Sequence, residues 1–328
     1  MKALCVVILF LFVIVEGYAQ YDSSLVWPAL PDKPRIKFVE MISPDQPFKH
    51  ESGGFFSKIA NFLFGEQKDR TWLVQPVGIA VAPDGIIYVA DPGAHGVHIF
   101  NREKKEYDFL SQTKYGDLLS PVGIAISSDG MIYITDSQRG DVLVLNKDRD
   151  PQFTFKTNLS RPTGIALFQN KLYIADPSRQ KVLIFDLNGN YIAEFGQRGA
   201  GNGEFNYPIA VTAANTLFVV DALNYRVEEF DVAGKFMYKF GKQGNAAGLL
   251  ASPKSIALDS DGDTYLTDAL MDNFQIFNKE GQLLLVVGRQ GYNAGEFMSP
   301  GGITIDNADN IYVVDMLNKR IQIFKYLK

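Results

Sequence analysis

Cysteine and histidine are scarce in this chain of 328 residues. The only cysteine is Cys5, so no disulfide framework can stabilise the fold. The three histidines are His50, His95 and His98, and the last two belong to one short segment. Zinc sites usually take three or four protein ligands that converge on one point, and this sequence predicts no such set. A Gly-x-Ser-x-Gly motif is also absent, so we expect no hydrolytic triad, no metal site and no cofactor.

An excess of positive charge is missing as well. Lysine and arginine number 32 against 37 acidic residues, which gives a net charge of −5 at pH 7. This balance argues against a general attraction to nucleic acid or to anionic lipid.

A long hydrophobic run is the third absence. The apolar run at residues 3–15 is shorter than the roughly 20 residues that a transmembrane helix needs. Lys2 precedes the run, and the small residues Gly17 and Ala19 follow it, which predicts a signal peptide at residues 1–19. We therefore expect a protein exported by a bacterium, periplasmic or extracellular, with no stable membrane insertion after cleavage.

Six repeats, 41–47 residues apart, occupy residues 76–328. They begin at Pro76, Pro121, Pro162, Pro208, Pro253 and Pro300. Each repeat has a first strand pattern, a turn rich in Asp, Gly or Asn, and a second strand pattern that ends at an aspartate. Third and fourth strand patterns follow, but the last repeat has only three. A period of this length with only strand signals is typical of a β-propeller with four strands in each blade.

The N-terminal region supplies the missing strand. Residues 35–42 form a lone strand pattern that can complete the sixth blade. A ring closed in this way leaves no unpaired edge that would invite aggregation. The prediction is an all-β, six-bladed propeller over residues 35–328, with four-stranded antiparallel blades and an N-terminal closing strand.

Two segments depart from the repeat pattern. Residues 20–34 are rich in proline and are expected to form an extended arm without a core of its own. Residues 43–75 carry phenylalanines at helical spacing, including Phe55 and Phe62, which predicts a short helix in an insertion before blade one. Docking of this helix on the propeller is favoured over binding to a membrane or a partner, because its polar face is not a basic stripe.

The repeats combine Pro-x-Gly-Ile-Ala, Ile-Tyr-Val-x-Asp and Asn-x-Arg-Ile/Val before Phe, and this combination resembles the NHL repeat. Residues 221–230 and 315–324 match it well. The chain as a whole is similar to exported bacterial NHL-repeat propellers, which implies the fold. The family includes RNA-binding modules, sensor domains of receptor kinases, an amidating lyase and secreted binding proteins, so the resemblance implies no single activity. The lyase branch uses metal-binding histidines from different blades, a pattern that this chain does not share.

One aspartate ends the second strand pattern of every repeat: Asp91, Asp136, Asp176, Asp221, Asp268 and Asp315. These acids could ring a central site, or each could cap the loop after its strand. Recurrence in every repeat favours the structural role, because aspartate readily accepts hydrogen bonds from nearby backbone N–H groups. Residues 259–263 resemble the start of a calcium loop, but Leu270 stands where an EF-hand needs glutamate, so a hairpin turn is favoured.

Positive side chains recur in the loops of one face of the predicted propeller. Three glycine-framed loops between blades are expected to place a cation similarly: Arg198, Lys242 and Arg289. The loops after the second strands add further candidate ligand-binding residues: His95, Arg139, Arg179, Arg226, Lys319 and Arg320. The alternative is that such cations form surface ion pairs, worth about 0–1 kcal/mol, with acids such as Glu204, Glu296 and the repeat aspartates.

Two functions follow from these observations. The favoured one is an exported, non-catalytic binding or scaffolding propeller that holds a protein or an anionic polymer on this face. The alternative is a metal-dependent propeller enzyme of the lactonase or lyase type. Nucleic-acid binding is disfavoured, because the protein is expected to be exported and its net charge is negative.

Overall fold

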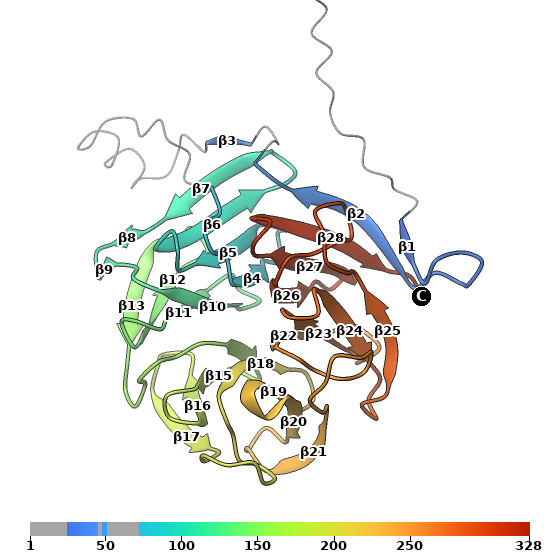
Figure 1. Ribbon diagram of the computed structural model, residues 1–328. Helices are drawn as coiled ribbons and strands as arrows, with labels where there is room; N and C mark the ends of the chain where they lie inside the picture. The colour runs from blue at the N-terminus through green and yellow to red at the C-terminus, as the bar shows by residue number, and fades with distance from the viewer. Residues whose placement is uncertain (1–24, 45–47, 51–71) are drawn as a thin grey trace, which may run out of the picture.

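The computed structural model describes residues 25–44, 48–50 and 72–328. The signal peptide expected at residues 1–19 and the helix expected around Phe55 and Phe62 lie outside the described residues. Six sheets stand around a common centre as the blades of a propeller (Figure 1). Among the described residues the only helical element is one 3₁₀ turn, η1 (Ala222–Asn224), and no helix there is long and apolar enough to cross a bilayer. The fold is an all-β, six-bladed propeller with four-stranded antiparallel blades.

In blades one to three the first strand is innermost and the others follow outward in chain order. Blade one contains β4 (Gly78–Val81), β5 (Ile87–Asp91), β6 (Gly96–Asn101) and β7 (Glu106–Leu110), with the short β3 (Lys49–His50) parallel to β7. Blade two contains β10 (Pro121–Ile126), β11 (Ile132–Asp136), β12 (Asp141–Leu145) and β13 (Pro151–Phe155). Blade three contains β14 (Ile165–Phe168), β15 (Lys171–Asp176), β16 (Lys181–Asp186) and β17 (Tyr191–Phe195). The hairpin of β8 (Gln112–Thr113) and β9 (Gly116–Asp117) lies between blades one and two along the chain.

Blades four and five repeat this order, and blade six combines the two ends of the described chain. Blade four contains β18 (Pro208–Ala213), β19 (Leu217–Asp221), β20 (Arg226–Phe230) and β21 (Phe236–Phe240). Blade five contains β22 (Pro253–Leu258), β23 (Thr264–Asp268), β24 (Asn273–Phe277) and β25 (Leu283–Val287). Blade six contains β26 (Pro300–Ile305), β27 (Asn310–Asp315), β28 (Arg320–Tyr326), β2 (Ile36–Ile42) and β1 (Val26–Trp27).

The N-terminal strand β2 pairs antiparallel with β28, and Ile36 lies opposite Tyr326 (Figure 1). β1 pairs with the other edge of β2, and the Trp27 ring packs edge-on against Phe324 with their centroids 5.7 Å apart. Through this contact Trp27 covers the outer part of blade six.

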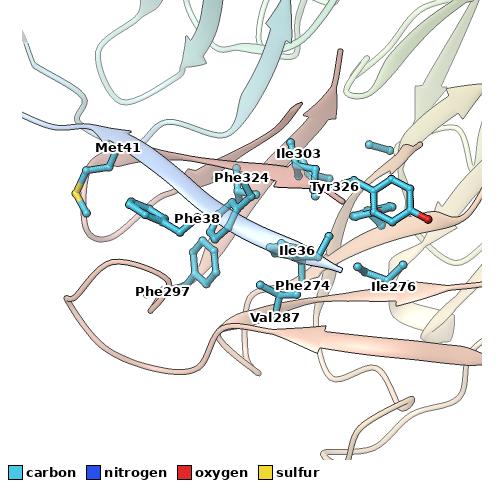
Figure 2. Packing of buried hydrophobic residues seen from close by; sticks show 14 residues of the cluster. Ile36, Phe38, Met41, Phe274, Ile276, Val287, Phe297, Ile303, Phe324 and Tyr326 are labelled. Atoms are coloured by element: carbon cyan, nitrogen blue, oxygen red, sulfur yellow. The ribbon is translucent and has the colours of Figure 1, made fainter. Parts of the chain in front are cut away.

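The hydrophobic core lies between neighbouring blades. Between blades five and six, Ile36 and Phe38 of β2 meet Phe274, Phe297 and Phe324, all of them fully buried (Figure 2). Because both faces of a blade are covered by its neighbours, every residue of β5, β11 and β23 is buried. Strands buried on both faces read as largely apolar runs, which explains the mostly apolar segment before each repeat aspartate; the exceptions are threonines, such as Thr135 and Thr267.

The innermost strands surround a central channel with a volume of about 290 Å³. These strands approach closely because small residues face the next blade. A Cβ atom at Gly78 would lie 1.9 Å from the carbonyl oxygen of Val122. Lys254 is the only charged residue among the described residues that line the channel.

Candidate binding surface

Two sets of loops lie at the same end of the blades. One set joins the last strand of a blade to the first strand of the next, and the other joins the second and third strands within a blade. Backbone hydrogen bonds tie the sets together: Leu223 N–H donates to the carbonyl of Asn206 (3.0 Å), and Leu317 N–H donates to that of Met298 (3.1 Å). We call the surface formed by both sets the inter-blade-loop face.

The six repeat aspartates lie beneath this face, and all are fully buried. Asp268 is typical. Its carboxylate accepts hydrogen bonds from Ala251 N–H (2.7 Å) and Ser252 N–H (2.9 Å) in the loop from blade four. The same carboxylate accepts from Leu270 N–H (3.1 Å) and Met271 N–H (3.2 Å) in its own loop. Asp268 therefore fastens the two sets of loops together from below.

The surroundings of Asp91, Asp221 and Asp315 shift their pKa values in different directions. Burial raises the pKa of Asp221 and of Asp315, although hydrogen bonds and a neighbouring arginine act against it. At Asp91 burial also raises the pKa, but the hydrogen bonds from His98 and from backbone N–H groups outweigh it, and the pKa is lowered. The pKa of an aspartate at this position therefore depends on the groups that lie beside it.

Arg226 and Arg320 are inside the protein, each with 6% of its surface exposed. The Arg320 Nε donates to Asp315 Oδ2 (2.7 Å), and its other nitrogens donate to the carbonyls of Tyr292 (2.6 Å) and Asn293 (2.8 Å). Arg226 pairs with Asp221 in the same way (2.9 Å). Internal hydrogen bonds therefore occupy both guanidinium groups, which corrects the prediction of these arginines as ligand-binding residues. Pairing with a repeat aspartate is the alternative of the sequence analysis, but these two pairs are buried and do not lie on the surface.

Arg139 and Arg179 are held at the edge of the face by internal partners. Arg139 Nη2 lies 2.8 Å from an oxygen of Asp141, and its side chain is 13% exposed. Arg179 Nη2 lies 3.0 Å from an oxygen of Glu194, which also pairs with Lys181. Both arginines match the ion-pair alternative of the sequence analysis.

The other predicted cations reach solvent. Arg198, Lys242 and Lys319 are exposed, and their side chains have no hydrogen-bond or ion-pair partner among the described residues. Arg289 is 82% exposed and pairs with Glu296 (2.9 Å). His95 is exposed, and its Nδ1 lies 2.6 Å from the carbonyl oxygen of Leu119.

The three glycine-framed loops do not place their cations identically. Arg198 pairs with Phe205 in an isolated bridge, and the equivalent bridges are made by Gln243 and Gln290. Arg198 therefore lies one position later in its loop than Lys242 and Arg289 do. The prediction of a similar placement is wrong for Arg198, because the repeated glycines fix the shape of the loop and not the place of its charge.

A buried glutamate lies below the loop that carries Arg198. Glu228 is fully buried, and the equivalent residues of blades five and six are Gln275 and Gln322. The Gln275 side chain accepts from Gly248 N–H (2.7 Å) and donates to the carbonyl of Leu249 (2.8 Å). Burial raises the pKa of Glu228 to about 7, although Arg226 beside it acts in the opposite direction.

Metal-ligand clusters are absent from the described residues: no three His, Cys, Asp or Glu side chains there could hold an ion. His98 is buried, with its Nδ1 2.9 Å from the Tyr107 hydroxyl and its Nε2 3.3 Å from Asp91. The segment that resembles a calcium loop is the turn between β22 and β23, where Asp259 accepts from Asp261 N–H (3.0 Å) and Asp263 N–H (2.9 Å).

Sequence analysis missed a set of exposed apolar residues on this face. Leu223, Leu270 and Leu317 are 53%, 74% and 60% exposed, and Tyr292 is 73% exposed. Each leucine is the second residue after a repeat aspartate, and the three are spaced 47 residues apart. That spacing was visible in the sequence, but leucine is usually assigned to the core, so only the structure shows that these side chains point outward.

Family models agree with the observed architecture. Residues 154–211 and 249–326 match the model described as a 6-bladed beta-propeller, and residues 73–100 match that of the NHL repeat. The chain is an NHL-repeat six-bladed β-propeller. The residues of this NHL-repeat propeller that the family models match lie in blades one, three, five and six, at the end of β13 in blade two and in the first strand of blade four.

Solved structures similar to the NHL-repeat propeller have several functions. A catalytically inactive variant of virginiamycin B lyase from Staphylococcus aureus, with quinupristin, is 16% identical, with a TM-score of 0.59 over 77% of this chain and 80% of that chain. An auxiliary nutrient binding protein from Bacteroides thetaiotaomicron is 16% identical, with a TM-score of 0.61 over 78% of this chain and 70% of that chain. A protein of unknown function from the same organism is 14% identical, with a TM-score of 0.64 over 77% of this chain and 70% of that chain. At these identities the likeness shows the fold alone.

Proposed function

We propose that this protein is an exported, non-catalytic binding propeller that holds an acidic protein or another anionic polymer on its inter-blade-loop face. One observation carries the proposal: the repeat aspartates are buried below the loops, whereas Arg198, Lys242 and Lys319 are exposed without a partner among the described residues. In a chain with a net charge of −5, this arrangement gives one face a local positive charge. Complementary charge of that kind steers association and selects partners.

A metal-dependent lyase or lactonase is the alternative function. The likeness to virginiamycin B lyase supports a common fold and not a common reaction. The described residues do not fit a metal centre, because His98 is engaged by Asp91 and Tyr107 and no other cluster of ligands lies nearby. We therefore favour a binding function over a catalytic one.

The test compares two charge-reversal variants of the full chain. One variant replaces Arg198, Lys242 and Lys319 by glutamate. The control variant replaces three exposed lysines in turns at the opposite end of the blades by glutamate: Lys104, Lys147 and Lys279. The net charge of both variants changes equally, so any difference between them reports the position of the charge.

Binding of polyglutamate and of heparin is measured by fluorescence anisotropy at rising salt concentration. We expect the wild type and the control variant to bind, with affinity falling as salt rises, and the face variant to lose about tenfold or more in affinity. Equal losses in both variants would remove the face from the proposal. If the wild type binds neither polymer, metal analysis of the purified protein becomes the next measurement.

A further inference from the structure

Three leucines occupy the same position in three consecutive blades of the inter-blade-loop face. We name Leu223, Leu270 and Leu317 the leucine arc; each is more than half exposed. The equivalent residues of blades one to three are Gly93, Gln138 and Ser178. At this position the exposed leucines are thus confined to blades four to six, although Val74 (45% exposed) and Leu119 (39% exposed) are further exposed apolar residues on the same face.

The fold does not require leucine at these positions. The loop is fixed by the aspartate two residues earlier, and Asp268 holds the Leu270 backbone N–H at 3.1 Å while the side chain remains 74% exposed. Polar residues at the equivalent positions of blades two and three leave the same aspartate bonds intact, as the N–H of Gln138 shows (3.1 Å to Asp136). Exposed apolar side chains that cluster on a polar surface mark sites of interaction.

An exposed tyrosine and two exposed cations lie in the loops beside the arc. Tyr292 is 73% exposed, and its carbonyl is fixed by Arg320, three residues after Leu317. Lys319 lies in the same loop as Leu317, and Arg289 lies in the same loop as Tyr292. Glu296 does not add free negative charge, because it accepts hydrogen bonds from Asn293 and Arg289. The surface around the arc therefore combines exposed apolar side chains with one exposed lysine, Lys319, that has no side-chain partner among the described residues, and with a surface ion pair between Arg289 and Glu296.

We propose that the leucine arc, with Tyr292, docks a protein segment in which apolar side chains alternate with aspartate or glutamate. This inference rests on the proposed function and adds the chemistry of the partner. Aliphatic side chains add little to binding of a polysaccharide or a nucleic acid, whose contacts are polar or made by stacking on aromatic rings. A peptide with both apolar and acidic residues matches both properties of the surface.

The probe is a phage-displayed library of random peptides, selected on the full-length protein. We expect the enriched peptides to contain Leu, Phe or Trp together with Asp or Glu. A synthetic copy of an enriched peptide is then titrated against the wild type and two variants. One variant carries Leu223→Ser, Leu270→Ser and Leu317→Ser; the control carries Ile192→Ser and Met237→Ser, which replace exposed apolar residues of the outer strands β17 and β21.

We expect the arc variant to lose about tenfold or more in affinity for the peptide and the control variant to bind as the wild type does. Absence of enrichment, enrichment of peptides without apolar residues, or equal binding by the arc variant would each overturn the inference. If the arc variant binds normally while the Arg198, Lys242 and Lys319 variant does not, the proposed function stands and only this inference fails. A dimer in light scattering that the arc variant abolishes would assign the surface to a second copy and also overturn it.

Discussion

Blades one to three and blades four to six share one fold and differ in what they expose. Both halves bury the repeat aspartate and tie its carboxylate to the same loops. After that aspartate, blades four to six place an exposed leucine where the first half has Gly93, Gln138 and Ser178. The difference shows that the buried positions specify the propeller, whereas the neighbouring exposed positions can differ between blades without changing the fold.

The largest expected change in the free energy of unfolding concerns arginine substitutions in the two halves. Arg320→Ala would leave the buried carboxylate of Asp315 without its charged partner, which costs about 3–5 kcal/mol in the free energy of unfolding. Arg179→Ala in blade three breaks a pair whose side chains are 27% and 20% exposed, and should cost about 1 kcal/mol or less. Urea denaturation of both variants measures the difference. Equal losses would contradict the division between internal and surface arginines.

The intermediate effect concerns the glutamate that blade four has in place of glutamine. Burial raises the pKa of Glu228 from 4.5 to about 7, so the folded protein keeps a proton that the unfolded chain releases between these values. Proton binding therefore stabilises the folded state fully below the lower value, and this stabilisation is lost as the pH rises through the higher one. We expect Glu228→Gln to increase the free energy of unfolding by about 1–3 kcal/mol at about pH 8 and to change it little at about pH 4.5.

The matched control for this prediction is Gln275→Glu in blade five, which should introduce a similar loss of stability at high pH. Urea denaturation at the two pH values gives all the free energies. A Glu228→Gln variant whose advantage does not depend on pH would show that the glutamate is ionised throughout.

The smallest expected change in the stability of the protein is for a substitution in the leucine arc. Leu270→Ser should change the free energy of unfolding by less than about 0.5 kcal/mol, because the side chain is 74% exposed in the folded state. Thermal and urea denaturation check this value. A larger loss would mean that the leucine supports the fold, and the contrast between the two halves would then concern stability and not recognition.

Much of the fold follows from the sequence, because the repeat places proline, turn residues and aspartate at constant intervals. Residue type alone does not tell which arginines are buried and which are exposed. Their position relative to the start of the third strand does. Each third strand begins five residues after the repeat aspartate, and Arg226 occupies that place, where it lies opposite Asp221. Arg179 comes two residues before the corresponding Lys181 and stays in the loop. The leucine arc could not be predicted from hydrophobicity alone, since the same residue type fills the core.

The pairing of β2 with β28 has a consequence for biosynthesis. Ile36 and Tyr326 are 326 − 36 = 290 residues apart, so the ribosome must add 290 residues after Ile36 before this pair can form. The added loop entropy is modest, roughly 1–2 kcal/mol more than for a contact across one repeat, but such non-local closure is slow. During that interval β28 presents an open edge, and a neighbouring nascent chain carries the strand that fits it. The seam that closes each finished ring is thus the place where two unfinished chains would exchange strands.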